Sequence, residues 1–412
     1  MHAVPICLAV ALATASAAAG DNWPEFRGPH GDGHAATEVP VRWGEAENVR
    51  WKTAIHDKGW SSPVVWGDQV WLTTARADGK RLFAVCVDRR TGKVLHDVAV
   101  FDVKKPAFCI SFNSYASPTP ALEAGRAYVH FGSAGTACLD SASGKVLWSR
   151  QDLPCDHWRG PGSSPILWHD LLIVHFDGFD RQYVVALDKA TGRTAWKKDR
   201  AIDYGTDNGD AKKAYGTPSV ITVGGRPELV SPAAAATLVY DPRTGKELWR
   251  VRHGGMNVSA RPLSGHGLLF LCSSDGGVGL LAVRPDGRRD VTRTHVAWTY
   301  NKGVPSRSSL LLVGDLLYMA NDNGVATCLE AKTGRRVWQK RLGGQFIASP
   351  VFAAGHIYFA SRDGRTHVLE PGRDPKVLAA NHLDDGCMAS PAVADGALFL
   401  RTLTHLYCIQ AR

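Results

Sequence analysis

The sequence lacks the short motifs by which many enzymes are recognised. It contains no G-x-S-x-G motif, typical of α/β-hydrolases, and no H-E-x-x-H motif, typical of zinc proteases. Its 16 histidines are scattered, and no pair has the spacing of metal ligands on a helix. The 48 Lys and Arg residues outnumber the 39 Asp and Glu residues, but they are spread through turns and form no recognisable nucleic-acid-binding module. The sequence therefore gives no sign of a hydrolase, a metalloprotease or a nucleic-acid-binding protein.

Long apolar runs are also scarce. Residues 1–19 predict a signal peptide, with an apolar stretch that ends in the small residues Ala17-Ala18-Ala19. Cys7 lacks the sequence context of a lipoprotein signal. No later segment has the ~18 consecutive apolar residues that a transmembrane helix needs. These observations predict a soluble exported protein, periplasmic or secreted, without a transmembrane segment.

What the sequence does contain is a repeated phrase, D-x-x-T-G-x-x-x-W. It runs from Asp188 to Trp196 and from Asp241 to Trp249, with Ser for Thr from Asp140 to Trp148 and Glu for Asp from Glu330 to Trp338. A degenerate copy begins at Asp88 and has His96 in place of the Trp. Self-similarity with a period of roughly 40–50 residues is typical of solenoids and propellers.

A second phrase interlocks with the first and sets the number of repeats. A small residue precedes a proline, and two apolar runs joined by a turn follow it. Its copies begin at Ser62-Pro63, Ser117-Pro118, Ser164-Pro165, Thr217-Pro218, Arg261-Pro262, Ser349-Pro350 and Ser390-Pro391, with Ser309-Leu310 as a copy without the proline. Eight copies predict eight structural units, or seven if the degenerate units around Asp286 and Glu370 are miscounted.

The sequence pattern of each unit predicts four antiparallel strands. The apolar runs have the length and alternation of strands, and Asn323-Gly324 and Asp363-Gly364 supply tight hairpin turns. A single sheet of this size cannot bury its faces, so the units must pack as blades around an axis. The last unit lacks a fourth strand, and the segment from Asn48 to Ile55 is a strand without a unit. We therefore expect an all-β, eight-bladed propeller whose ring is closed by this N-terminal strand.

Most of the repeating Trp and Cys residues are expected to be structural. The Trp that ends each phrase would pack between blades, since one indole buries about 150–250 Å². Five of the eight cysteines beyond the signal peptide recur at small-residue positions of the repeat and are expected in the core: Cys86, Cys138, Cys272, Cys328 and Cys408. Of the loop cysteines, Cys109 and Cys155 lie in neighbouring blades, and a disulfide between them is a hypothesis.

The phrase from Val185 through Trp196 closely resembles the repeat of the quinoprotein, or PQQ-like, propeller family. The resemblance covers about residues 48–412, after a signal peptide at 1–19 and an N-terminal extension at 20–47. Within this extension the segment from Asn22 to Pro29 looks like the leader of many exported PQQ-like repeat proteins. The family includes PQQ-dependent dehydrogenases and non-enzymatic, BamB-like outer-membrane assembly proteins.

This resemblance implies two alternative functions. A BamB-like propeller would be a monomeric, non-catalytic binding or assembly scaffold in the cell envelope, with an envelope protein or an extended peptide as partner and no cofactor. A quinoprotein oxidoreductase would hold PQQ with Ca²⁺ in the funnel, typically against a disulfide between adjacent cysteines. The absence of adjacent cysteines in this sequence favours the scaffold.

The candidate site follows from the register of the repeat. Loops from every blade meet where the inner strands of a propeller begin, so the residues three before each proline, or its equivalent, are expected to ring one mouth of the channel. These residues are Trp60, Tyr115, Gly162, Tyr215, Ser259, Arg307, Ile347 and Met388, and longer loops would add Asn113, His157, Trp158, Arg159, Asp207 and Asn208. The ring would suit a flat ligand or an extended peptide, or it would simply plug the channel.

One loop also offers clustered oxygen atoms. Its candidate metal ligands are Asp203, Asp207, Asn208 and Asp210, which would suit a hard cation. An ordinary Asp- and Gly-rich loop is the alternative.

Overall fold

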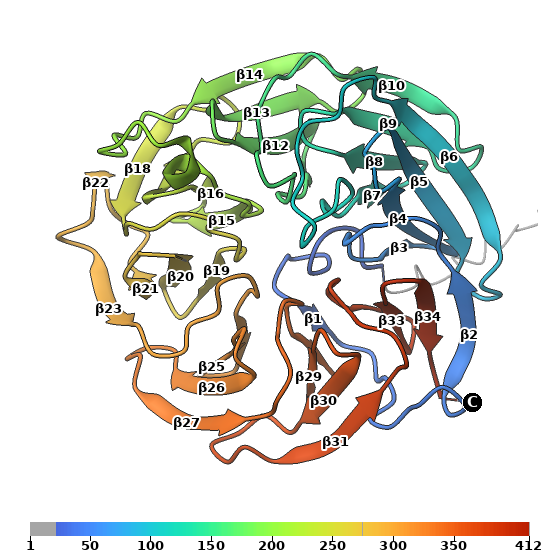
Figure 1. Ribbon diagram of the computed structural model, residues 1–412. Coiled ribbons are helices and arrows are strands. Elements are labelled where there is room, and N and C mark those ends of the chain that lie inside the picture. The colour runs from blue at the N-terminus through green and yellow to red at the C-terminus, as the bar shows by residue number, and fades with distance from the viewer. Residues whose placement is uncertain (1–21, 274, 412) are drawn as a thin grey trace, which may run out of the picture.

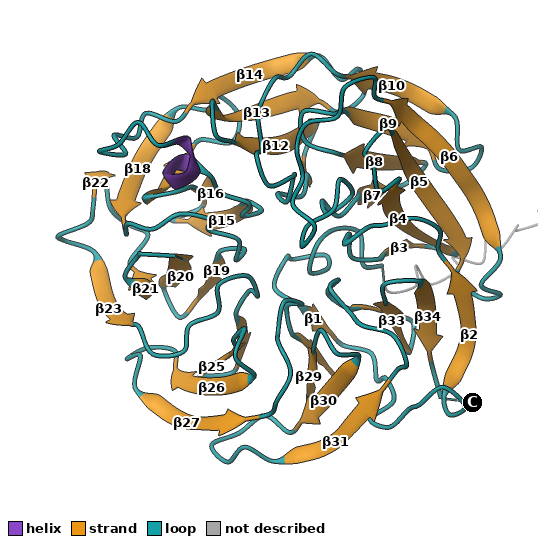
Figure 2. Cartoon of the chain, viewed as in Figure 1, coloured by secondary structure: helices purple, strands orange, loops and turns teal. Residues whose placement is uncertain are grey.

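The computed structural model describes residues 22–273 and 275–411, and these residues form eight β-sheets arranged in a ring around a central axis (Figure 1). Every sheet contains four antiparallel strands, and two sheets carry one additional parallel strand at an edge. The predicted all-β, eight-bladed propeller is therefore confirmed. Across the described residues the only helix is the short 3₁₀ helix η1 (Gly209–Lys212), as Figure 2 shows.

The blades follow one another in chain order, and each runs from an inner to an outer strand. Blades 1 to 4 consist of β3 (Val64–Trp66), β4 (Gln69–Ala75), β5 (Arg81–Asp88) and β6 (Val94–Asp102); β7 (Ala121–Glu123), β8 (Arg126–His130), β9 (Thr136–Asp140) and β10 (Val146–Arg150); β11 (Ile166–Trp168), β12 (Leu171–Asp177), β13 (Gln182–Asp188) and β14 (Thr194–Asp199); and β15 (Ser219–Val223), β16 (Arg226–Pro232), β17 (Ala236–Tyr240) and β18 (Glu247–Arg252).

The second half of the ring repeats this order. Blades 5 to 8 consist of β19 (Leu263–Gly265), β20 (Leu268–Ser273), β21 (Gly279–Val283) and β23 (Val296–Tyr300); β24 (Leu311–Val313), β25 (Leu316–Ala320), β26 (Val325–Glu330) and β27 (Arg336–Arg341); β28 (Val351–Ala353), β29 (His356–Ala360), β30 (Arg365–Leu369) and β31 (Val377–His382); and β32 (Ala392–Ala394), β33 (Ala397–Arg401), β34 (His405–Ile409) and β2 (Val49–Ala54). The additional strands are β1 (His34–Ala35) on blade 7 and β22 (Arg289–Asp290) on blade 4.

The ring is closed by strands from the two ends of the described chain. Strand β2 pairs antiparallel with β34 (Figure 1), and in this register Trp51 lies opposite Cys408. This pairing gives the last blade its fourth strand, as expected for the segment from Asn48 to Ile55. Because β2 covers the edge of β34, the closure also removes a strand edge that would otherwise invite aggregation.

The repeated Trp and the repeated Gly form one contact between neighbouring blades. The indole N–H of Trp148 donates a hydrogen bond to the carbonyl oxygen of Lys189 in the next blade, at 3.0 Å. A Cβ atom added to Gly192, in the same turn, would lie 2.6 Å from the Trp148 ring. Trp51, Trp196 and Trp298 make the equivalent indole contacts with Arg89, Pro242 and Ala331. The Trp is therefore an inter-blade contact, and the turn needs Gly because the indole lies against it.

Blades 1 and 5 show what happens when one partner of this contact is missing. His96, which replaces the Trp in blade 1, still bonds through Nε2 to the carbonyl oxygen of Ser141 in the next blade, at 3.2 Å. Trp249 faces blade 5, which lacks the Thr-Gly turn, and its indole donates instead to Glu228 in its own blade, at 2.8 Å. The polar group of the inter-blade side chain is satisfied in both cases.

The N-terminal extension runs into the central channel. Trp23 forms an antiparallel bridge with Val65 of blade 1, and β1 pairs parallel with β28, the innermost strand of blade 7. Arg27 is buried at 2% exposure and donates to the carbonyl oxygens of Leu310 and Pro350 in blades 6 and 7. Residues 22–35 of this extension therefore contact inner strands on several sides of the channel. We call this segment the leader.

The expected core cysteines are all buried, and of the Trp residues between the blades Trp51, Trp196 and Trp338 are buried whereas Trp148 and Trp298 are partly buried. No helix in the described part of the chain is long and apolar enough to cross a membrane. The predicted signal peptide at residues 1–19 lies outside the described residues.

Candidate functional site

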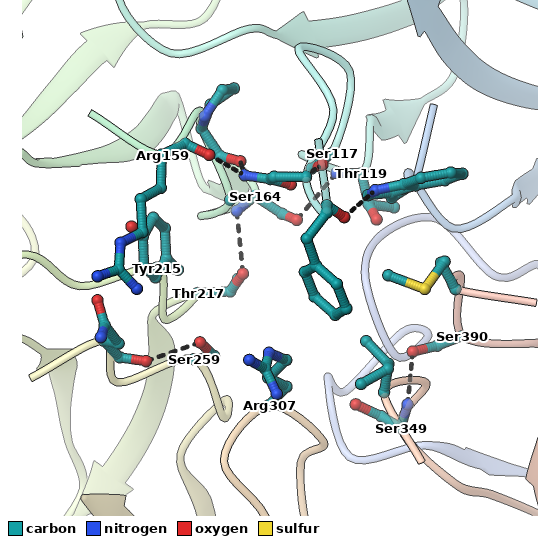
Figure 3. Close-up of a pocket in the computed structure, with 18 of the residues that line it drawn as sticks. Ser117, Thr119, Arg159, Ser164, Tyr215, Thr217, Ser259, Arg307, Ser349 and Ser390 are labelled. Atoms are coloured by element: carbon teal, nitrogen blue, oxygen red, sulfur yellow. Dashed lines mark hydrogen bonds between the residues drawn. The ribbon is translucent and has the colours of Figure 1, made fainter. Parts of the chain in front are cut away.

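One end of the ring opens into a cavity of about 220 Å³. Its lining includes residues that shortly precede the inner strand of every blade, and Figure 3 labels ten of the lining residues. Phe26 of the leader also lines the cavity, together with Ile110, Phe112 and Asn113 from the connection between β6 and β7. We refer to this cavity as the funnel.

Most of the residues selected by the repeat register line the funnel, and one does not. The lining includes Trp60, Gly162, Tyr215, Ser259, Arg307, Ile347 and Met388. Tyr115 lies outside it, because its hydroxyl donates to the carbonyl oxygen of Ala107 and its ring lies over Gly79.

The reason for this misplacement is a doubled proline. The sequence Ser117-Pro118-Thr119-Pro120 contains two candidates for the repeat proline, and β7 begins directly after the second. The position equivalent to Trp60 is therefore Ser117, which does line the funnel. The register expected for blade 2 was wrong by two residues.

A long connection crosses the mouth of the funnel. Residues 103–120 join β6 to β7, and such long irregular loops in compact domains are commonly functional. The carbonyl oxygen of Phe112 accepts a hydrogen bond from the Trp60 indole at 3.0 Å. From blades 6 and 7, the guanidinium groups of Arg307 and Arg362 lie 4.8 and 5.2 Å from the centre of the Phe112 ring. Cation–π attraction therefore ties this loop to blades 6 and 7.

Arg159 enters the funnel wall as part of a charged group. Its Nη2 atom lies 2.9 Å from Asp210 Oδ2, and the other oxygen of Asp210 accepts from the fully buried Nζ of Lys213. The pKa of Asp210 is lowered by these two cations, against the opposing effect of burial. The three residues together carry one net positive charge.

The expected metal ligands do not converge. Asp210 is held by its two cations, Asn208 Oδ1 accepts from the backbone N–H of Asp210 at the start of η1, and Asp203 Oδ1 accepts from the N–H of Gly205. Within residues 22–273 and 275–411 no group of three or more His, Cys, Asp or Glu side chains could hold a metal ion. The segment is the alternative described above, an Asp- and Gly-rich loop.

His157 and the two loop cysteines lie behind the funnel wall. His157 is buried at 6% exposure and accepts from the N–H of Ser133, and burial lowers its pKa to about 4. Cys155 Sγ lies 3.8 Å from His157 Nδ1, while Cys109 Sγ faces the carbonyl oxygens of Ile110 and Arg159. Both thiols are free, so the hypothesised disulfide is not formed.

The small residues before the prolines form a feature that the sequence did not reveal. Seven hydroxyls, one from every blade except blade 5, each accept a hydrogen bond of 2.8–3.0 Å from a backbone N–H of the preceding blade. We call this set the hydroxyl belt. Its members are Ser62, Thr119, Ser164, Thr217, Ser309, Ser349 and Ser390, and all but Ser309 line the funnel (Figure 3).

The hydroxyl belt is interrupted at Arg261. Since a guanidinium cannot accept a hydrogen bond, the backbone N–H of Thr217 has no belt partner in blade 5. The Arg261 side chain instead reaches the leader, where Nη2 lies 2.6 Å from Glu25 Oε1 and Nη1 donates to the carbonyl oxygen of Phe26. Arg261, which interrupts the belt, therefore anchors the leader.

Three buried guanidinium groups lie beside or beneath the belt. Arg27 bonds the carbonyl oxygens of Leu310 and Pro350, each directly after a belt residue, and Arg401 bonds the hydroxyl of Ser61 at 2.7 Å. Burial lowers the pKa of both arginines to about 9. Only Arg261 has a carboxylate partner, Glu25, whose own pKa is raised by burial. In the described part of the chain, neither Arg27 nor Arg401 forms an ion pair.

Two polar atoms in the funnel wall have no hydrogen-bond partner among the described residues. One is the buried hydroxyl of Tyr215, and the other is Oδ1 of Asn257, a residue 9% exposed. The Asn257 amide nitrogen donates to Asp275 Oδ2 at 2.8 Å, which leaves Oδ1 as an unused acceptor. Buried polar groups without a partner are uncommon and call for an explanation.

Three exposed aromatic side chains form a row beside the funnel. Phe108, Trp158 and Phe179 are 56%, 43% and 37% exposed, and they come from three different loops. The ring centres of Phe108 and Trp158 are 5.4 Å apart, and those of Trp158 and Phe179 are 5.5 Å apart. Arg159, the neighbour of Trp158, lines the funnel, so this aromatic row adjoins the cavity.

Comparison with known proteins shows which protein family this chain matches. A family profile described as "Outer membrane protein assembly factor BamB" matches residues 41–178 and 180–409. The BamB protein of Legionella pneumophila (strain Paris) is 22% identical over 241 residues, which is 58% of this chain and 48% of that protein. The chain therefore spans about half the length of this curated relative.

Solved structures share the fold. BamB from Moraxella catarrhalis superposes with a TM-score of 0.62 at 13% identity, covering 87% of this chain and 99% of that one. The quinohemoprotein alcohol dehydrogenase from Comamonas testosteroni superposes with a TM-score of 0.68 at 12% identity, covering 97% of this chain and 82% of that one. At such identities the likeness is one of fold.

Proposed function

The chain belongs to the family described as outer membrane protein assembly factor BamB, and from this premise we propose that it is a non-catalytic binding scaffold of the cell envelope whose funnel face docks a partner. The aromatic row carries this proposal. Three large apolar side chains from separate loops gather in solvent beside a cavity. Exposed apolar clusters rimmed by polar residues mark interaction sites.

The aromatic row also has the composition of a binding surface. Aromatic and arginine residues are enriched among those that dominate binding energy at interfaces, and Arg159 and Arg307 lie in the adjacent funnel wall. Lys104 and Lys105 lie in the same loop as Phe108. The partner we propose is an envelope protein that presents an extended segment to this face.

The quinone and calcium site implied by the other branch of the resemblance does not fit these residues. The chain has no adjacent cysteines. Among the described residues that line the funnel, Asp275 is the one carboxylate, and it already accepts from Asn257. Calcium takes six to eight oxygen ligands, usually with several carboxylates, and the nearby arginines oppose a cation. We therefore derive no redox step for this chain.

Site-specific photo-cross-linking tests the scaffold proposal. A photoreactive phenylalanine analogue at Phe108 is expected to capture one envelope partner in intact cells, and the same analogue at Leu147 is the matched control. Leu147 is 47% exposed, but it lies on β10 at the outside of blade 2. Equal capture from the two positions would reject the proposal.

A second variant ties the cross-link to the aromatic row. Trp158→Ala removes a large apolar contact, worth about 2 kcal/mol on docking, so the cross-link from Phe108 should fall about thirtyfold. Leu147→Ala should leave it unchanged. A cross-link that survives Trp158→Ala would mean that the partner lies elsewhere.

A further inference from the structure

The hydroxyl belt presents hydrogen-bond donors to the funnel. Each belt hydroxyl uses a lone pair to accept a backbone N–H, and no belt hydroxyl donates a hydrogen bond to any described residue. The belt side chains are nearly buried, between 1% and 5% exposed, so few of these O–H groups can be satisfied by bulk water. The free Tyr215 hydroxyl adds another donor in the same wall. A ligand in the funnel must therefore supply acceptor oxygens.

The positive charge buried beside the belt favours negatively charged oxygens. Arg27, Arg261 and Arg401 contribute three guanidinium groups next to the belt, and Glu25 is the only carboxylate that pairs with them among the described residues. Unpaired buried charges are costly, and a nearby anion offsets that cost. Arg159 with its two partners adds one more positive charge at the wall.

The wall also favours a ligand that donates a hydrogen bond. Asn257 Oδ1 is a buried acceptor without a partner, and its amide nitrogen is committed to Asp275. Sulfate provides oxygens but no hydrogen-bond donor at neutral pH. A peptide backbone provides an N–H group within a few ångströms of an acidic side chain.

Resting on the proposed function, we propose that the funnel binds an extended peptide segment of the partner through an aspartate or glutamate, with its carboxylate on the hydroxyl belt and a backbone N–H on Asn257. The cavity of about 220 Å³ is large enough for one or two side chains rather than for a folded element. Phe112, Ile347 and Met388 supply an apolar wall for the residue beside the acid. An aromatic or aliphatic neighbour then continues toward the aromatic row.

Two peptides that differ in one side-chain group test whether binding needs the negative charge of the peptide. Acetyl-Gly-Phe-Asp-Gly-amide and its Asn counterpart, each with a fluorophore, are titrated with the full chain at low ionic strength and followed by anisotropy. We expect the Asp peptide to bind at least tenfold more tightly, with the difference shrinking as salt is added. Equal binding of both peptides, or binding of neither, overturns the inference.

Substitutions in the hydroxyl belt test whether the peptide carboxylate binds there. Thr217→Val should weaken the Asp peptide about five- to tenfold and leave the Asn peptide unchanged, whereas Thr217→Ser keeps the hydroxyl and should bind like the parent. Should Thr217→Val fail to fold, Tyr215→Phe removes only a hydroxyl that has no partner and should weaken both peptides about threefold. Loss of affinity for both peptides with Thr217→Val, or no loss with either variant, would contradict the placement.

The competing explanation is a simple oxyanion site. Sulfate that displaces the Asp peptide at a concentration equal to the peptide's own dissociation constant would overturn the peptide assignment. The fate of the proposed function is read separately. If the parent protein cross-links from Phe108 but does not bind the Asp peptide, only this inference is rejected. If the parent protein gives no cross-link from Phe108, the proposed scaffold function is rejected.

Discussion

The contact between the repeated Gly and the repeated Trp makes a quantitative prediction. Gly192 and Gly125 both have a positive φ, +74° and +77°, so an alanine at either position costs about 1–2 kcal/mol in backbone strain. At Gly125 nothing lies within 4 Å of the added Cβ, but at Gly192 the Trp148 ring lies 2.6 Å away. Gly192→Ala therefore adds an overpacking cost of about 1–3 kcal/mol and weakens the indole hydrogen bond by about 1 kcal/mol.

Urea unfolding followed by tryptophan fluorescence measures the two costs. We expect a loss of about 3–6 kcal/mol for Gly192→Ala and about 1–2 kcal/mol for Gly125→Ala, at 25 °C and pH 7.5. A double-mutant cycle isolates the contact, because Trp148→Ala removes the atoms that the new Cβ would meet. In that background the cost of Gly192→Ala should fall to that of Gly125→Ala. Equal costs for the two single glycine variants, or a cost unchanged by Trp148→Ala, would refute the reasoning.

Three further predictions concern pH, the leader and the thiols. Burial lowers the pKa of His130 to about 3 and of His157 and His253 to about 4, so the unfolded chain binds protons below its ordinary pKa of about 6.5 that the folded chain does not. The free energy of unfolding is therefore highest above about pH 7 and falls as the pH drops from 6.5 toward 4, by on the order of 1–2 kcal/mol per histidine at pH 5. A urea midpoint that does not change between pH 7.5 and pH 5 would contradict this. Arg261→Met leaves Glu25 buried without its partner and should cost about 3–5 kcal/mol, with faster proteolysis within residues 22–35 by mass spectrometry; Glu25→Gln in the same chain should restore part of the loss, and a leader as resistant as in the parent would count against its anchoring role. A thiol reagent should modify Cys109, which is partly exposed, well before the buried Cys138, and isolation of a Cys109–Cys155 disulfide from the native protein would contradict the free thiols.

The repeating parts of the fold could be predicted from the sequence because each copy supports the reading of the others. Eight phrases gave eight blades, and an unmatched strand at Asn48 pointed to the incomplete last blade. The packing roles of the Trp and of the buried Cys residues followed from their fixed positions in the phrase. The hydroxyls before the prolines were visible as small residues, but their bonds between blades depend on an alignment of loops in space that no single copy contains.

The site was harder to predict because it consists of segments that do not repeat. The doubled proline near Ser117 shifted the register by two residues, which exchanged a lining residue for Tyr115. Neither the path of the leader into the channel nor the position of Phe112 between two arginines has a counterpart elsewhere in the chain. Asp210 looked like a metal ligand because Arg159, which comes from another loop, is brought to it only by folding.

The interruption of the hydroxyl belt at Arg261 has a consequence for any ligand in the funnel. A ring of eight equivalent donors would offer a small carboxylate eight equivalent orientations, and the bound ligand would be rotationally disordered about the axis. Arg261 turns away and holds Glu25 and Phe26 of the leader at this one position of the ring. This single substitution breaks the rotational pseudo-symmetry of the propeller. A peptide that enters the funnel consequently meets one distinguishable side and can be held in a single direction relative to the aromatic row.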